Sequence, residues 1–189
     1  MFPVNQVILV SKFNYRDEHM IYIYHDYGGT HTTSIAAAFH LHLLKPSSLP
    51  LTSEEVLAVP FFNKLTKKDA GRLLFHGRDS DGHKVYTIGK KSSKLIVPAL
   101  YDMTLMLFDH FQVDDQIILS NTSPTVPFVM SIGGGLSRGL GIDTLGVPLL
   151  IKGTKKCSPL IYDLVVHTKK QALQTTEKVL LLENQHFKI

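Results

Sequence analysis

The chain has 189 residues, of which 44% are hydrophobic and 19% are charged, a balance that excludes a disordered protein and suits one globular core. The formal net charge of +4 favours a phosphorylated ligand or an acidic surface, and it is too small to indicate nucleic-acid binding. The single cysteine, Cys157, excludes an intramolecular disulfide and a multi-cysteine metal site. With no secretory signal pattern and no apolar run of about 20 residues, we expect a cytoplasmic protein without a transmembrane segment.

The first part of the chain divides at residue 20. We predict that residues 1–19 form an N-terminal extension or an edge strand, and that residues 20–189 form a single α/β domain. An almost continuous apolar and aromatic run over residues 20–24 predicts a strand that is buried on both faces. The alanine-rich segment 35–39 predicts the helix that follows it.

A glycine turn joins this strand to this helix. Two adjacent glycines let a ligand approach the main chain, and the free N–H groups of a helix's first turn attract anions. We therefore predict an anion-binding site in this first β-α loop. The alternative is a structural turn in which Thr30 or Thr32 caps the helix. The Walker A and dinucleotide-binding patterns are both absent. The predicted ligand-binding residues of the loop are Gly28, Gly29, Thr30, Thr32 and Thr33, and the predicted catalytic residues are His31, Asp26 and His25.

The middle of the chain predicts short elements and a hairpin. Thr52 and Glu55 form a capping-box pattern at the start of a short helix, and a second short helix is predicted around residues 67–70. The runs 73–76 and 85–88 flank an Asp-Gly turn, which predicts a β-hairpin inserted in the domain.

Basic residues on and after this hairpin are candidates for binding phosphate. Arg72 and Arg78 are the predicted ligand-binding cations, and whether they face the glycine loop is left open. The run 90–94 carries three lysines; we interpret it as a solvated loop, with a phosphate clamp as the alternative.

A helix over residues 95–111 and a buried strand over residues 116–120 come next. Ligands gather at the carboxyl ends of strands in open α/β sheets, so the polar residues after this strand are further site candidates. Asn121 is the foremost of them, followed by Thr122 and Ser123.

The last third predicts a helix from about residue 126, with glycines at 133–135 that indicate a close helix crossing or a break. A second phosphate loop that carries Arg138 is the alternative. We predict a strand over residues 146–153, a helix over 159–171, and an edge strand or short helix at 179–182. The whole pattern predicts a three-layer α/β domain with a mostly parallel sheet, a glycine-rich first β-α loop and the hairpin insertion.

The segment from Ile23 through His25, Gly28-Gly29 and His31 into the alanine-rich helix resembles the start of an uncharacterised family of spore-forming Firmicutes, the domain of unknown function DUF3189. The likeness continues through 54–62, 71–73 and 134–148, and it covers roughly residues 20–165. Members often carry cysteine where this chain has Asp26, so a required thiolate is not expected here. The resemblance implies a spore-former and no known reaction.

Three functions follow from these residues. The first is a protein that binds a phosphate-containing small ligand or a nucleotide at the first β-α loop, with phosphotransferase or hydrolase activity open. In it, His31 acts as acid, base or phosphate ligand, and Asp26 can bind Mg²⁺. The second is a metal-dependent hydrolase that uses His25, Asp26 and His31 around zinc or another divalent metal. The third is a non-enzymatic, sporulation-associated interaction protein. The sequence leaves the ligand, the metal and the oligomeric state open.

Overall fold

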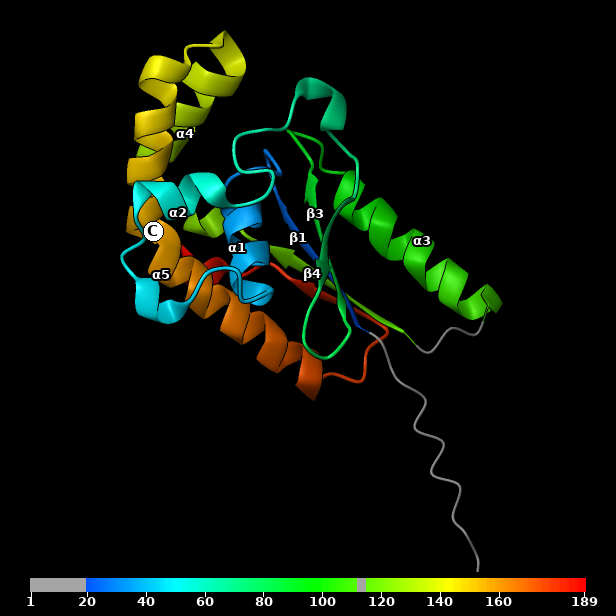
Figure 1. Cartoon of the computed structure of the whole chain (residues 1–189). Coiled ribbons are helices and arrows are strands. Elements are labelled where there is room, and N and C mark those ends of the chain that lie inside the picture. The colour runs from blue at the N-terminus through cyan, green and yellow to red at the C-terminus, as the bar shows by residue number, and fades with distance from the viewer. Residues whose placement is uncertain (1–19, 112–114) are drawn as a thin grey trace, which may run out of the picture.

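The computed structural model describes residues 20–111 and 115–189, so the predicted extension over residues 1–19 lies outside the described residues. The described part is a mixed α/β fold around a five-stranded sheet (Figure 1). The strands, in spatial order, are β2 (Leu74–Arg78), β3 (Lys84–Gly89), β1 (Met20–Asp26), β4 (Gln116–Asn121) and β5 (Val179–Leu182). All neighbouring pairs are parallel except β2–β3, which is antiparallel. The predicted mostly parallel sheet is confirmed; that β2–β3 is an insertion stays a prediction.

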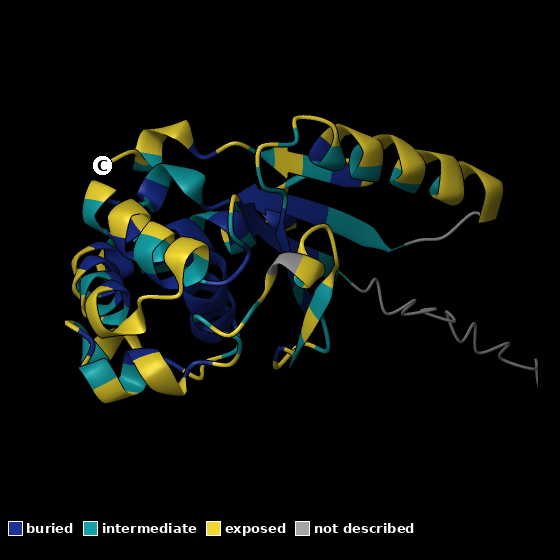
Figure 2. Ribbon diagram, turned by 90° about the horizontal axis from the view of Figure 1, so that it is seen from above, coloured by how far each residue is buried: buried dark blue, intermediate teal, exposed yellow. Residues whose placement is uncertain are grey.

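Helices cover both faces of the sheet. On one face lie α1 (Thr32–His40), α2 (Ser53–Ala58) and the long α5 (Asp143–Gln174), and on the other lies α3 (Ile96–Phe111) (Figure 1). The strands alternate accordingly: Tyr22 and Tyr24 are buried in the core with α1 and α5, whereas Ile23 is buried in the core with α3. The outer face of α3 is exposed along most of its length (Figure 2).

The order of the strands defines where a ligand site is expected. The chain runs from β1 to its neighbour β3 on one side, and then crosses to β4 on the other side. In open α/β sheets, ligands bind outside the carboxyl ends of the strands at the point where the winding reverses. In this fold that point is the crevice beyond the ends of β1 and β4.

The C-terminal helices cross at glycines. Helix α4 (Phe128–Gly134) continues without a break into a π-helix (Gly135–Gly139). A Cβ on Gly133 would lie 2.9 Å from the Gly146 carbonyl oxygen, and one on Gly146 would lie 2.6 Å from the Ser137 nitrogen. A Cβ on Gly153 would lie 2.9 Å from that of Met130. The predicted close crossing is therefore confirmed.

The same crossing overturns one prediction. The strand predicted over residues 146–153 is wrong, because this apolar segment lies inside α5. Its apolar and β-branched residues resemble a buried strand, but its glycines and Leu150 are buried against α4. Periodicity alone does not distinguish a short buried strand from a buried helical segment.

The shorter elements follow their sequence signals. Thr52 and Glu55 form the predicted capping box, in which the Thr52 hydroxyl accepts from the Glu55 N–H at 3.1 Å. Residues 67–69 form a 3₁₀ turn, and the α3 helix and the β5 edge strand are confirmed. None of the described helices has the length and apolar character that a membrane span requires.

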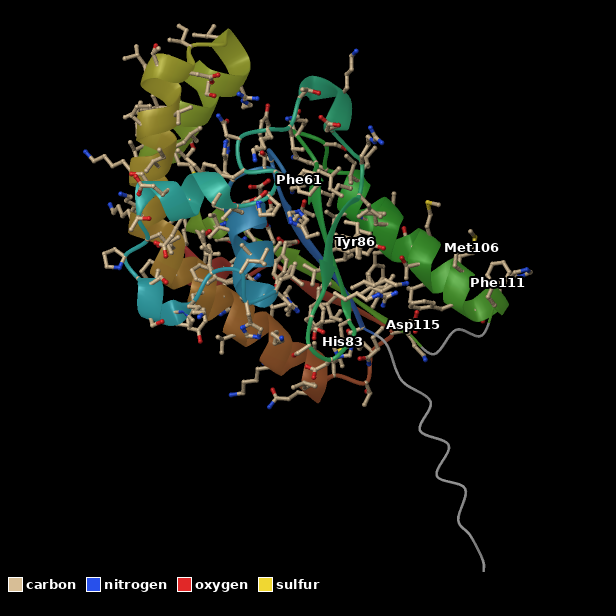
Figure 3. The ribbon with its side chains drawn as sticks, viewed as in Figure 1. Phe61, His83, Tyr86, Met106, Phe111 and Asp115 are labelled. Carbon is tan, nitrogen blue, oxygen red and sulfur yellow. The ribbon has the colours of Figure 1, made fainter. Side chains whose placement is uncertain are left out.

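A buried polar network ties the β2–β3 turn to the helices at the amino-terminal end of β1. The Tyr24 hydroxyl lies 2.8 Å from His40 Nδ1, and His40 Nε2 lies 3.1 Å from the Asp79 carboxylate. Lys169 on α5 donates to the same carboxylate at 3.4 Å. His83 in this turn and Phe61 mark opposite ends of the sheet (Figure 3). This network therefore lies away from the carboxyl ends of the strands.

Candidate functional site

A cavity of about 1,030 Å³ opens beyond the carboxyl end of β1. Its wall combines the end of β1 and the loop after it, the loop after β4, and the helical segments around the π-helix. The lining residues are Asp26, Tyr27, Gly28, Thr30, His31, Leu65, Thr66, Ala70, Lys91, Ser123, Val126, Met130, Ser131, Gly134, Gly135, Ser137, Arg138, Gly139, Gly141 and Asp143. The cavity thus lies at the crevice that the winding of the sheet defines.

The glycine turn of the first β-α loop has a specific steric cause. Gly29 has a φ of +72°, and a Cβ there would lie 2.7 Å from the Gly89 Cα at the end of β3. The segment that follows β3 is also bound to the loop, because the Lys91 N–H donates a hydrogen bond to the Tyr27 carbonyl at 2.9 Å. This close approach places Lys91 at the cavity wall.

The first turn of α1 is uncapped. His31 is the N-cap and makes no side-chain capping bond. The Thr30 hydroxyl donates to the Phe61 carbonyl at 2.6 Å, and the Thr32 hydroxyl donates to the Asp26 carboxylate at 2.7 Å. The capping by Thr30 or Thr32 that the alternative interpretation required is therefore absent at this helix. Within the described residues, the N–H groups of Thr32, Thr33 and Ser34 have no hydrogen-bond partner.

Asp26 sits at the base of the loop. Its side chain is only 5% exposed, and it accepts the Thr32 hydroxyl and the Gly29 N–H. The Thr32 hydroxyl also lies 3.0 Å from that of Thr122, at the end of β4. These contacts fix one carboxylate at the edge of the cavity between the two central strands.

His31 is half-buried at the cavity wall. Its Nε2 lies 3.2 Å from Asn63 Oδ1, and its ring meets that of Phe62 edge-on at 5.4 Å between centroids. Burial lowers the pKa of His31, and the charges of Arg138 and Lys91 act in the same direction. The hydrogen bond to Asn63 and the charge of Asp26 oppose that shift. His31 therefore lies in the fields of two cations and one carboxylate that all line the cavity.

Arg138 reaches this wall from the π-helix. Its guanidinium donates to the Leu65 carbonyl and to the Asp143 carboxylate, each at 3.4 Å, and its side chain is 34% exposed. These bonds are long, and an exposed pair of this kind contributes little to stability. The guanidinium is thus held near the cavity by contacts that a stronger anion can replace.

His25 points away from these groups. It is 1% exposed, and neither ring nitrogen has a hydrogen-bond partner among the described residues. Burial lowers its pKa to about 4, with Lys90 contributing. It does not line the cavity, because Asp26 and His25 are successive strand residues that face opposite sides of the sheet. The three predicted catalytic residues therefore do not converge.

The described part of the chain offers one group of three acidic or histidine side chains with metal-ligand spacing, namely Asp79, Asp81 and His83. That group lies in the β2–β3 turn, and none of its three residues lines the cavity. His25, Asp26 and His31 do not form such a group. The described geometry thus provides no three-residue metal centre at the glycine loop.

The predicted ligand-binding residues fall into two groups, those that line the cavity and those that do not. Gly28 and Thr30 line the cavity, whereas Gly29, Thr32 and Thr33 do not. Asn121 donates to Glu183 at 2.8 Å, Arg72 pairs with Asp69 at 3.7 Å, and Arg78 donates to the Gly82 carbonyl at 2.8 Å. Asn121, Arg72 and Arg78 do not line the cavity. The cavity's cations are instead Lys91 and Arg138, which the sequence offered only as alternatives.

Three polar residues of the site carried no sequence signal. Asn63, Ser137 and Asp143 form a hydrogen-bonded chain behind His31. Asn63 is 32 residues from His31 and 74 from Ser137, so only the folded chain brings them together. The positive φ of Asn63, 52°, is a conformation that asparagine tolerates better than most residues.

The fold and the cavity define a class: an α/β protein with a candidate ligand site at the switch point of its sheet. The chain belongs to the family described as protein of unknown function (DUF3189), whose model matches residues 21–170. No curated protein and no solved structure matches the chain. The origin in a spore-former that the sequence resemblance implies stays a prediction.

Proposed function

We propose that this protein binds a phosphate-containing small molecule in the cavity beyond β1. The observation that carries the proposal is that one cavity is lined by two cations, Lys91 and Arg138, and by His31, the N-cap residue of an uncapped helix. Free helix N–H groups and the positive end of the helix dipole favour an anion. His31, through which the helix begins, lines the same cavity as both cations.

The size of the cavity supports an organic phosphate rather than inorganic phosphate alone. Small-molecule sites usually enclose about 300–1,000 Å³, and this cavity is at the upper end of that range. Leu65, Val126 and Met130 give part of the wall an apolar character. A nucleotide or another phosphomonoester therefore suits the cavity as a whole.

Two of the predicted catalytic residues keep a role in this proposal. His31 is the group that can exchange a proton beside the phosphate, and Asp26 is the carboxylate that can bind a divalent cation brought by the ligand. Turnover, as a phosphotransferase or a hydrolase, is a further step that this proposal does not require.

The experiment is a thermal-shift screen of inorganic phosphate, nucleoside mono-, di- and triphosphates, each with and without Mg²⁺. A ligand at 100 times its Kd stabilises the fold by about 2.7 kcal/mol, and each kcal/mol raises Tm by roughly 2–4 °C in a domain of this size. We expect a shift that Arg138→Gln and His31→Ala reduce. Arg78→Gln and Arg72→Gln are the matched controls, because these arginines lie outside the cavity.

Each outcome decides something. A shift lost in Arg138→Gln and kept in Arg78→Gln supports the cavity as the anion site. Equal losses in both arginine variants indicate binding by net charge and contradict the proposal. No shift with any phosphate compound also contradicts it and returns attention to a protein partner.

A further inference from the structure

The hydrogen-bonded chain behind His31 has a direction that its chemistry determines. It runs from Asp143 at the start of α5, through Ser137 in the π-helix, to Asn63 and then to His31 Nε2. Three of its four members, His31, Ser137 and Asp143, also line the cavity. Which ring nitrogen of His31 carries its proton depends on which way this chain is oriented.

The orientation starts at Asp143. The bond from Ser137 and the charge of Arg138 lower the pKa of Asp143, so at neutral pH it is a carboxylate and can only accept. The Ser137 hydroxyl has two acceptors within reach, Asp143 and the Asn63 oxygen, and its single proton is donated to Asp143, the closer and charged acceptor. Arg138 Nε and Nη2, each 3.4 Å from Ser137 Oγ, also require that oxygen to act as an acceptor.

The orientation then passes through Asn63. Because Ser137 Oγ accepts, the amide atom of Asn63 that lies 3.0 Å from it must be the NH₂ group. With the amide reversed, two oxygen atoms without a shared proton would lie 3.0 Å apart, closer than the 3.3 Å that separates them in this orientation. The Asn63 oxygen, 3.3 Å from the same hydroxyl, therefore faces His31 Nε2 at 3.2 Å. Since that oxygen can only accept, His31 Nε2 must donate.

We propose that Asn63 is a positioning residue which, set by Ser137 and Asp143, holds neutral His31 with its proton on Nε2 and the Nδ1 lone pair free for the cavity. Within the described residues, Nδ1 has no hydrogen-bond partner, and a Cβ on Gly134 would lie 3.9 Å from it. Nδ1 then accepts a hydrogen bond from a hydroxyl group or a water molecule beside the bound phosphate. Nδ1 accepts this hydrogen bond through its lone pair, while Nε2 keeps its bond to Asn63. This role of Nδ1 rests on the proposed function, whereas the tautomer of His31 does not.

The tautomer can be measured directly by ¹⁵N NMR of histidine-labelled protein at a pH where His31 is neutral. The His31→Gln variant identifies the signals of this residue. In the unmodified protein we expect a pyridine-like Nδ1 and a pyrrole-like Nε2. In Asp143→Asn, where the new amide can donate to Ser137, we expect both nitrogens to move toward intermediate shifts.

Asn63→Gly removes the relay at its centre and suits the positive φ of this position, so it should give the same mixing of tautomers. Asp102→Asn is the charge-matched control, because Asp102 is exposed on α3 away from the cavity, and it should change neither signal. A pyridine-like Nε2 in the unmodified protein, or unchanged shifts in both relay variants, would overturn the inference.

Titration with inorganic phosphate separates this inference from the proposed function. A phosphate-dependent shift of the Nδ1 signal supports both. If phosphate binds and Nδ1 carries the proton, the relay is refuted and the anion site remains. If the Nε2–H tautomer is found and no phosphate compound binds, the relay is retained and the proposed role of Nδ1 is refuted.

Discussion

The glycines at 133 and 135 allow a matched test of the α4–α5 crossing. Replacing a helical glycine by alanine normally stabilises a helix by about 0.8–1 kcal/mol. At Gly135 a Cβ would meet no atom within 4 Å, so only this gain is expected. At Gly133 a Cβ would lie 2.9 Å from the Leu150 nitrogen and 2.9 Å from the Gly146 oxygen, which are backbone atoms and cannot rotate away.

Overpacking of this kind costs about 1–3 kcal/mol. Because the propensity gain is common to both variants, the overpacking cost is the expected difference between Gly133→Ala and Gly135→Ala. Each kcal/mol corresponds to roughly 2–4 °C in Tm for a domain of this size, so melting curves and urea unfolding can resolve it. We expect the Tm of Gly135→Ala to equal or exceed that of the unmodified protein, and the Tm of Gly133→Ala to be lower than that of Gly135→Ala. Equal stability of the two variants, or the reverse order, would refute the close crossing.

Two further predictions concern buried titratable groups. Burial lowers the pKa values of His25 and His40 to about 4, below the unfolded value of about 6.5, so the unfolded state binds more protons between these limits. The free energy of unfolding should therefore fall as pH decreases from about 6.5 to about 4, by roughly 1.4 kcal/mol per pH unit for each histidine. His25→Leu should flatten this dependence in urea titrations, and an unchanged slope would count against it. Burial also raises the pKa of the Cys157 thiol to about 12, so a thiol reagent should label it rapidly only after unfolding; fast labelling of the native protein would contradict this.

Local signals were sufficient for most of the fold. The apolar run before Gly28 and the alanines after it predicted β1 and α1, and the hydroxyl–carboxylate spacing of Thr52 and Glu55 predicted the α2 cap. These features depend on residues within a few positions of one another. The strand predicted over residues 146–153 was wrong because the conformation of this segment depends on its contacts with α4. No pattern within the segment indicates those contacts.

The sequence predicted only part of the candidate site, because some of its residues are brought together by contacts between segments far apart in the chain. Asp26, Gly28 and His31 belong to one continuous loop, so their closeness follows from the sequence. The choice among the arginines does not: Arg72 and Arg78 adjoin the antiparallel β2–β3 pair, whereas Arg138 reaches the cavity from the π-helix. That difference depends on a crossing between helices far along the chain.

The crossing and the site are therefore parts of one arrangement. Gly133 and Gly146 let α4 and α5 approach closely, and the short π-helix that follows Gly134 turns Ser137 and Arg138 toward the loop of His31. A π-helical turn is rare and is frequently found at functional sites. In this protein the π-helix carries Arg138, one cation of the cavity, and Ser137, whose hydroxyl accepts from Asn63. The glycines thus account for how a wall built by the C-terminal half of the chain meets the loop that precedes α1.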